Sequence, residues 1–252
     1  MLNVMTHGEP TDRPALLIAH GLFGSARNWG VIARRLAETR QVHVVDMRNH
    51  GESFWDDSHT YQALAGDLAQ VISGACDVLG HSMGGKAAMA LALLHPEKVR
   101  RLVVADIAPV GYLHTQMHLV QAMSGLDLSE INSRGDADKA LTAAVADAGV
   151  RAFLLQSLDV KEKKWRLNLR VLGARMADII GWPEISGRFD GPVLFLSGAE
   201  SDYVLPAHRP DIKRYFPQAR FAELAGAGHW LHADKPREFE AALQTFLDRA
   251  VG

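Results

Sequence analysis

The stretch that decides the fold is DVLGHSMGGKAAMALALLHP, residues 77–96, in which Ser82 lies between Gly80 and Gly84. A short apolar run precedes the serine, and an alanine- and leucine-rich segment typical of a buried helix follows it. This order predicts a nucleophile elbow, a tight strand-to-helix turn that presents the serine hydroxyl at a sheet edge. Glycines are expected beside Ser82 because side chains there would collide, and Gly85 lets the helix approach the strand.

Short apolar runs alternate with amphipathic helical stretches on both sides of this elbow. The expected strands are 15–19, 42–46, 78–80, 102–106, 193–197 and 220–224. The expected helices are 28–39, 61–72, 84–95, 207–215 and 236–250. This alternation predicts an α/β fold with a mostly parallel sheet flanked by helices, whose ligand site lies beyond the carboxyl ends of the strands.

Residues 111–187 interrupt the alternation. Their pattern is helical, richer in charge and without a convincing buried strand. We therefore expect an α/β core formed by residues 1–110 and 188–252, with residues 111–187 inserted as a helical cap.

The bulk properties exclude several function classes. The chain has 252 residues, 48% of them apolar, and a net charge of −2, which gives no electrostatic footprint for nucleic acid. No window approaches the roughly 20 apolar residues of a membrane span, and the N-terminus lacks the pattern of a signal peptide. Cys76 is the only cysteine, so no intrachain disulfide is possible. We expect a cytoplasmic monomer or homodimer without membrane or nucleic-acid partners.

A serine nucleophile needs a base, usually a histidine held by a carboxylate. The glycine-rich segment GAGHWLHADKP, residues 226–236, follows an expected strand and contains His229 and His232. His229 is favoured as the base because its flanking glycines allow the loop to bring it over the sheet edge. A metal site formed by the two histidines is disfavoured because no cysteine or carboxylate cluster completes it, so no metal is expected.

The oxyanion site requires two backbone N–H donors. Met83, directly after the serine, supplies the first at the start of the helix. HGLFG, residues 20–24, follows an early strand and supplies the second, with Leu22 preferred and Phe23 as the alternative.

Two aspartates compete for the role of the acid. Asp106 ends the expected strand at 102–106, whereas Asp202 lies in the loop GAESDYVLP, residues 198–206. We prefer Asp106 because it lies at the carboxyl edge of the sheet, within reach of His229. Each aspartate could instead have a purely structural role: Asp106 could cap a loop, and Asp202 could cap the helix expected near residue 207.

These motifs resemble the α/β-hydrolase superfamily, and more narrowly its small bacterial acyl-ester and thioester hydrolases related to mammalian abhydrolase-domain proteins. The matching segments are HGLFGS, DMRNHGES, LGHSMGGKAAM, VVADIAPV, WRLNL and GAGHWLHADKP. The resemblance implies a catalytic triad, a helical cap and no cofactor. Typical relatives read G-x-x-D-x-x-V-P where this chain places Ser201 in the aspartate position and Asp202 one residue later. Relatives with serine there favour Asp106, but many of them lack Asp202, so both aspartates stay open.

The implied activity is hydrolysis of carboxylic esters, or of acyl-CoA thioesters, with short to medium acyl chains through an acyl-enzyme. The alternatives are a carbon–carbon bond hydrolase of the same fold and a non-catalytic ligand-binding receptor. An apolar substrate pocket is expected from Phe23, Met117, Met123, Phe153, Leu154, Trp182 and Ile185. A basic run in the cap could attract coenzyme A phosphates, although a solvated face is the commoner role of such a run: Lys161, Lys163, Lys164, Arg166 and Arg170.

The segment DMRNHGES, residues 46–53, contains Asp46, Arg48 and His50. We expect these side chains to form a polar network that fixes the loop beside the elbow, and not to take part in the chemistry.

Overall fold

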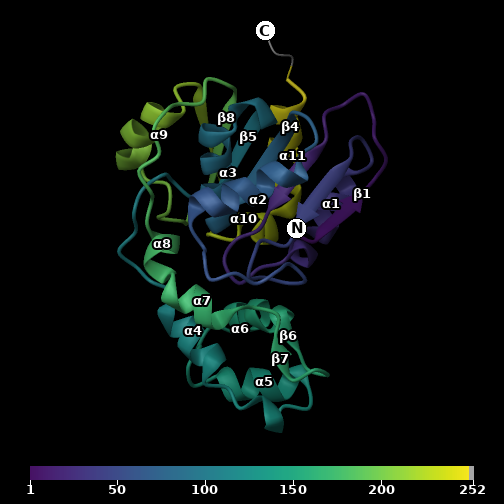
Figure 1. Cartoon of the computed structure of the whole chain (residues 1–252), viewed down its shortest axis with the longest axis vertical. Helices are drawn as coiled ribbons and strands as arrows, with labels where there is room; N and C mark the ends of the chain where they lie inside the picture. Colours follow the sequence, from purple (N-terminus) through teal and green to yellow (C-terminus); the bar gives the residue numbers. More distant parts are fainter. Residues whose placement is uncertain (250–252) are drawn as a thin grey trace.

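The computed structural model describes residues 1–249 and has a seven-stranded sheet with helices on both faces (Figure 1). The strand order is β1-β3-β2-β4-β5-β8-β9, and all neighbouring strands are parallel except β1 and β3. The strands are β1 (Val4–His7), β2 (Leu16–Ala19), β3 (Val42–Val45), β4 (Cys76–His81), β5 (Val99–Ala105), β8 (Val193–Gly198) and β9 (Ala219–Leu224). The predicted α/β fold with a mostly parallel sheet is confirmed.

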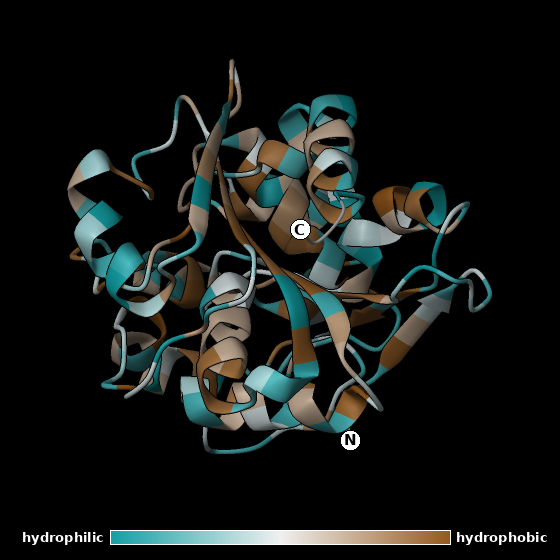
Figure 2. Ribbon diagram, turned by 90° about the horizontal axis from the view of Figure 1, so that it is seen from above, coloured by the Kyte–Doolittle hydropathy of each residue, from teal (hydrophilic) through white to brown (hydrophobic). Residues whose placement is uncertain are grey.

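Helices cover the two faces of the sheet and form two hydrophobic cores. The buried residues of α1 and α11 belong to one core, and those of α2, α3 and α9 belong to the other. Hydrophobic residues run along the central strands between these layers (Figure 2). The helices of this part are α1 (Gly30–Leu36), α2 (Tyr61–Val71), α3 (Met83–Leu94), α9 (Arg209–Tyr215), α10 (Leu231–Asp234) and α11 (Pro236–Leu247), with short 3₁₀ turns η1 (Ala26–Trp29), η2 (Pro96–Lys98) and η5 (Pro206–His208).

Strand β1 was not predicted. It pairs antiparallel with β3 at the edge of the sheet, and its residues are mostly exposed, so it lacks the continuous apolar run of the buried strands. The predicted helix at 236–250 is observed as α11, which ends at Leu247, and residue 250 lies outside the described residues.

The segment between β5 and β8 forms a lobe at one end of the molecule (Figure 1). Its elements are α4 (Met117–Ser124), η3 (Leu128–Glu130), α5 (Arg134–Leu141), α6 (Ala148–Leu154), η4 (Leu155–Ser157), β6 (Leu158–Asp159), β7 (Lys164–Trp165), α7 (Leu169–Ala174) and α8 (Met176–Ile180). The pattern here is helical, as expected, with one addition. Strands β6 and β7 form a small antiparallel pair whose two-residue length leaves no periodic signal in the sequence.

Lys86 lies on α3, the helix that follows Ser82, and forms hydrogen bonds with both ends of this lobe. Its side chain is buried, and Nζ donates hydrogen bonds to the carbonyls of Val110 (2.8 Å), Ile180 (2.9 Å) and Gly181 (2.5 Å). An ammonium group has three donors, and all three are used here. Burial lowers the pKa of Lys86 to about 7.

We expect this buried lysine to make stability depend on pH. Its pKa is about 7 in the folded protein and near the usual lysine value of 10.5 in the unfolded chain. Between these values the unfolded chain binds more protons, so raising the pH favours the folded state. The free energy of unfolding of the wild type relative to Lys86→Met should therefore rise from pH 7 to pH 10, by at most about 1.4 kcal/mol per pH unit. Urea denaturation at matched ionic strength measures this difference, and a flat or falling difference would contradict the assignment.

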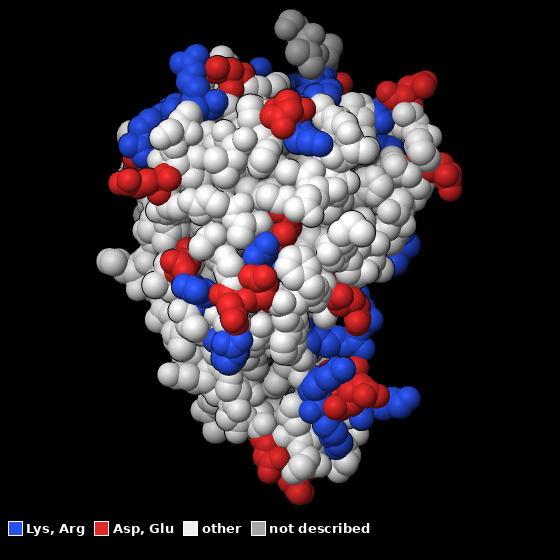
Figure 3. All heavy atoms as spheres, viewed as in Figure 1, with Lys and Arg blue, Asp and Glu red and all other residues white. Residues whose placement is uncertain are grey.

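Charges of both signs lie intermixed on the face shown in Figure 3, including on the inserted lobe at the bottom. No helix within residues 1–249 is long and apolar enough to cross a membrane. Over the same residues, no group of three or more His, Cys, Asp or Glu side chains is arranged to hold a metal ion.

Candidate active site

Ser82 lies in the turn between β4 and α3 with φ 53° and ψ −121°. This positive φ is a strained conformation for a residue with a side chain, and such strain is typical of functional turns. A side chain at Gly80 would collide with the Gly84 carbonyl, and one at Gly84 would collide with the carbonyls of Ala19 and His20. The two glycines therefore fit the close packing expected of an elbow.

His229 bridges Ser82 and Asp106. Its Nε2 lies 3.1 Å from Ser82 Oγ, and its Nδ1 lies 2.7 Å from Asp106 Oδ2. The three residues come from the β4–α3 turn, the end of β5 and the loop after β9, which meet at the carboxyl edge of the sheet. Because Nδ1–H donates a hydrogen bond to the carboxylate, Nε2 carries no proton and its lone pair faces the serine hydroxyl.

The carboxylate of Asp106 is fully buried and held by two further donors. The Gly198 N–H donates to Oδ1 (3.1 Å), and the Ser201 hydroxyl donates to Oδ2, the oxygen that faces His229. Asp202 is exposed, and within the described residues its side chain makes no hydrogen bond to His229. The structure thus brings Asp106 to the histidine, with Ser201 as its neighbour.

Two contacts that sequence reasoning missed orient the imidazole of His229. The Tyr203 ring stacks on it with centroids 4.0 Å apart and planes 20° apart. His81 Nε2 lies 2.9 Å from the His229 carbonyl oxygen and donates a hydrogen bond to it. Tyr203 follows the position where relatives place the acid, but only the folded loop shows that its ring faces His229.

His232, the competing base, lies in a different environment. Its ring is stacked on Trp29 with centroids 4.3 Å apart, and its Nδ1 is buried without a hydrogen-bond partner in the described residues. Burial lowers the pKa of His232 to about 3, so the ring is neutral near pH 7. No hydrogen bond joins it to Ser82 or Asp106 within residues 1–249.

The candidate oxyanion donors face the same cavity as Ser82. Leu22, Phe23 and Met83 all line it. The Phe23 N–H already donates to His50 Nε2 (3.2 Å), whereas the N–H groups of Leu22 and Met83 have no acceptor within the described part of the chain. This arrangement favours Leu22 over Phe23 as the second donor.

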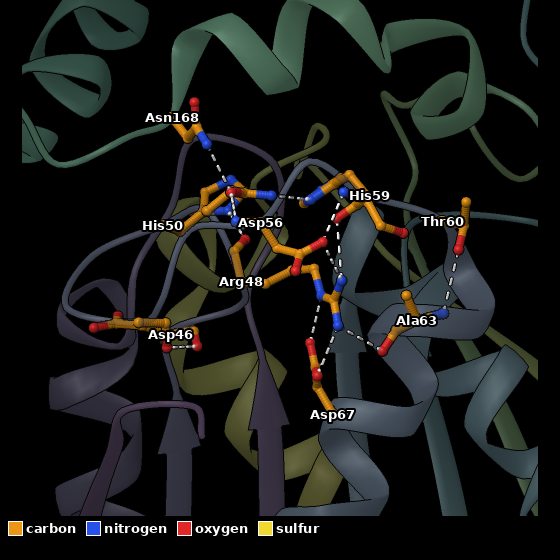
Figure 4. A network of polar contacts seen from close by, with 12 residues as sticks. Asp46, Arg48, His50, Asp56, His59, Thr60, Ala63, Asp67 and Asn168 are labelled. Atoms are coloured by element: carbon orange, nitrogen blue, oxygen red, sulfur yellow. Dashed lines mark hydrogen bonds and ion pairs between the residues drawn. The ribbon is translucent and has the colours of Figure 1, made fainter.

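The predicted polar network is present in the loop after β3 (Figure 4). Asp46 accepts hydrogen bonds from the Ala26 and Glu52 N–H groups, and Arg48 forms a two-point pair with Asp67 (2.5 and 2.8 Å). These contacts fix the loop beside the elbow.

The cavity at the serine has a volume of about 420 Å³, within the usual range of ligand pockets. The nucleophile, the base and the predicted Phe23 and Phe153 all line it. Apolar and aromatic side chains that were not predicted complete much of the wall: Trp29, Tyr61, Ile107, Tyr112, Leu119, Val145, Val150, Ile179, Ile180, Tyr203 and Trp230.

Five residues predicted to line the pocket do not line it. Met123, Leu154 and Ile185 are buried in the hydrophobic core, and Met117 and Trp182 pack against the same core. Apolar periodicity identified their buried faces correctly. It did not distinguish a face that packs against other helices from one that faces a cavity.

The basic run of the lobe is largely engaged elsewhere. Arg166 pairs with Glu52 and Asp159, and Arg170 pairs with Asp57 (2.5 Å). Lys163 donates to the Ile131 carbonyl. None of the five basic residues lines the cavity, among the residues described. Three of the five basic residues thus have partners away from the cavity, and Figure 3 shows acidic side chains among the basic ones in this lobe.

The geometry of the site agrees with a comparison of the whole chain with known families. The model of the alpha/beta hydrolase family matches residues 16–242. The chain belongs to this family. The predicted relation to bacterial esterases and mammalian abhydrolase-domain proteins is confirmed by its relatives.

Several relatives match nearly the full length of the chain. The sn-1-specific diacylglycerol lipase ABHD11 of Mus musculus is 41% identical and covers 93% of this chain and 81% of its own. Esterase YbfF of Escherichia coli (strain K12) is 39% identical, with 98% of each chain covered. A solved structure described as a marine microorganism esterase matches with a TM-score of 0.92 at 36% identity, covering 97% of this chain and 98% of its own. Their names support an ester-hydrolysing enzyme.

Proposed function

We propose that the chain hydrolyses carboxylic esters of short to medium acyl chains through a covalent intermediate on Ser82. The observation that carries the proposal is the position of His229, within hydrogen-bond distance of both Ser82 Oγ (3.1 Å) and Asp106 Oδ2 (2.7 Å). The names of the relatives, esterase and lipase, support the same reaction type.

In the first half-reaction Ser82 Oγ attacks the ester carbonyl carbon while His229 Nε2 accepts the hydroxyl proton. The N–H groups of Leu22 and Met83 stabilise the negative charge that develops on the carbonyl oxygen. The ester C–O bond then breaks, the alcohol takes the proton from His229, and the acyl group stays on Ser82. Asp106 holds the imidazole in the required tautomer and stabilises its positive charge.

In the second half-reaction a water molecule takes the place of the alcohol. His229 accepts one proton of the water as the water oxygen attacks the acyl carbon. The bond between the acyl carbon and Ser82 Oγ then breaks as His229 returns that proton to Oγ. The products are the carboxylic acid and the restored serine. A thioester follows the same path with a thiol as the leaving group, so acyl thioesters are included among the proposed substrates.

Acyl-chain length should have a defined optimum. Each buried methylene contributes about 0.8 kcal/mol, or roughly a fourfold gain in kcat/KM, until the pocket is full. Because a cavity of about 420 Å³ must hold both the acyl and the alcohol groups, we expect kcat/KM for p-nitrophenyl esters to peak at short to medium chains. A series from acetate to palmitate measures this, with matched acyl-CoA thioesters in parallel. Values that still rise at palmitate would contradict the proposed chain length.

A serine-directed fluorophosphonate probe separates catalysis from mere binding. We expect stoichiometric labelling of the folded protein and loss of esterase activity in the same proportion. Absence of labelling would instead favour a non-catalytic receptor.

A further inference from the structure

The Phe23 residue next to the candidate donor Leu22 is held on both sides. Its N–H donates to His50 Nε2 (3.2 Å), and its carbonyl accepts from the Ser157 hydroxyl (3.0 Å). Phe23 has φ 64°, a left-handed conformation that is unfavourable for a non-glycine residue. Such a conformation persists only where the surroundings enforce it. Here His50 comes from the loop after β3, and Ser157 comes from the inserted lobe.

The tautomer of His50 follows from its partners. A backbone N–H can only donate, so Nε2 must accept from Phe23, and Nδ1 must carry the proton that it donates to the Arg48 carbonyl (2.9 Å). His50 is completely buried, and this burial holds its pKa well below the usual range. The ring is therefore neutral near pH 7 and keeps the Nε2 lone pair that Phe23 requires.

The same loop also contacts the residue that carries the other donor. The Asp56 N–H and the Asn168 amide both donate to Asn49 Oδ1 (2.9 and 3.0 Å), so the Asn49 amide nitrogen faces His59 Nδ1 (3.2 Å) as a donor. His59 must then carry its proton on Nε2, which lies 3.3 Å from the sulfur of Met83. One loop thus reaches both sides of the oxyanion site.

We propose that His50 is a positioning residue for the oxyanion site, which it serves by fixing Phe23 so that the Leu22 N–H faces Ser82, with Ser157 as the second support. This inference rests on the proposed function, because it assigns Leu22 and Met83 to the oxyanion. It also links the lobe to catalysis, since Ser157 belongs to the lobe and Asn168 binds the backbone and side chain of Asn49.

Two substitutions at His50 distinguish the hydrogen bond that Nε2 accepts from Phe23 from the one that Nδ1 donates to the Arg48 carbonyl. The amide of His50→Gln reaches the position of Nε2 and can still accept from Phe23. The shorter amide of His50→Asn reaches only the position of Nδ1, so Phe23 loses its acceptor. Removing a direct oxyanion donor lowers kcat by about 10²–10³. We expect an indirect loss of about 10- to 100-fold for His50→Asn and a smaller one for His50→Gln, with KM nearly unchanged.

A thionoester distinguishes a misplaced oxyanion site from general damage. Its sulfur is a weaker hydrogen-bond acceptor than oxygen, so an intact site favours the oxoester. We expect the oxoester-to-thionoester ratio of kcat/KM to fall about tenfold or more in His50→Asn, to recover in His50→Gln, and to fall by a smaller factor in Ser157→Ala. His43→Asn is the matched control, because His43 lies on β3, half-buried, and bonds Thr6 outside the site.

If His50→Asn fails to fold, Ser157→Ala still tests the inference, because it removes the other hydrogen bond that fixes Phe23. An unchanged ratio in a folded His50→Asn protein, or in Ser157→Ala, would overturn the inference while leaving the esterase intact. Full hydrolysis by a Ser82→Ala protein would instead overturn the proposed function itself.

Discussion

Replacement of Ser82 by alanine is expected to lower kcat for p-nitrophenyl ester hydrolysis by about 10⁶. The substitution removes the only atom that forms the acyl bond, while His229 and Asp106 keep their mutual contact of 2.7 Å. Residual turnover above water would come from the oxyanion donors and substrate binding alone.

The fold should survive this substitution. Ser82 has φ 53°, and alanine does not remove this strain, so no large gain or loss in stability is expected. Circular dichroism and the unfolding midpoint provide the control. A folded Ser82→Ala protein with substantial activity would contradict the assignment of the nucleophile.

Replacement of Asp106 by asparagine is expected to lower kcat by about 10⁴. The Gly198 N–H would still donate to the amide oxygen, so the amide nitrogen would face the Ser201 hydroxyl and His229 Nδ1. An N–H group at that place favours the tautomer with the proton on Nε2. Such a histidine cannot accept the proton of Ser82.

Asp202→Asn is the matched comparison, because it makes the same chemical change at the other candidate acid, which lies in the loop after β8. Asp202 is exposed, and we expect its substitution to change kcat by less than about threefold. Steady-state kinetics of both variants measure the ranking. A severe loss in Asp202→Asn with a mild one in Asp106→Asn would transfer the role of the acid to Asp202.

The parallel strands and the elbow could be predicted because each carries a local signal. The continuous apolar runs mark β2, β5 and β8, and the glycines around Ser82 are required by backbone contacts within a few residues. Strand β1 carries no such signal, since its side chains are mostly exposed and its pairing with β3 joins residues about 40 positions apart.

The choice between the two aspartates could not be made from the sequence alone. Asp106 and Asp202 both follow strands that end at the same sheet edge, so topology places both near His229. The choice depends on the direction of each side chain, which the folded loops decide. In the structure the Ser201 hydroxyl donates to the Asp106 carboxylate, and Asp202 is exposed to solvent.

The substrate pocket was the least predictable part of the site. Helical periodicity places Met123 and Leu154 on buried faces, and both are buried, but they pack within the core. Several residues that line the cavity, such as Ile107, Tyr203 and Ile180, lie at the ends of elements or in loops, where periodicity does not predict the direction of a side chain. Their positions depend on how the lobe sits over the sheet, which is a long-range property.

The most direct test of the mechanism is mass spectrometry of the wild-type protein after inhibition by a fluorophosphonate. The account predicts one adduct per chain, located on Ser82, with esterase activity lost in proportion to its formation, and much slower adduct formation in Asp106→Asn. An adduct on another residue, or full esterase activity in a protein whose Ser82 is completely modified, would contradict it.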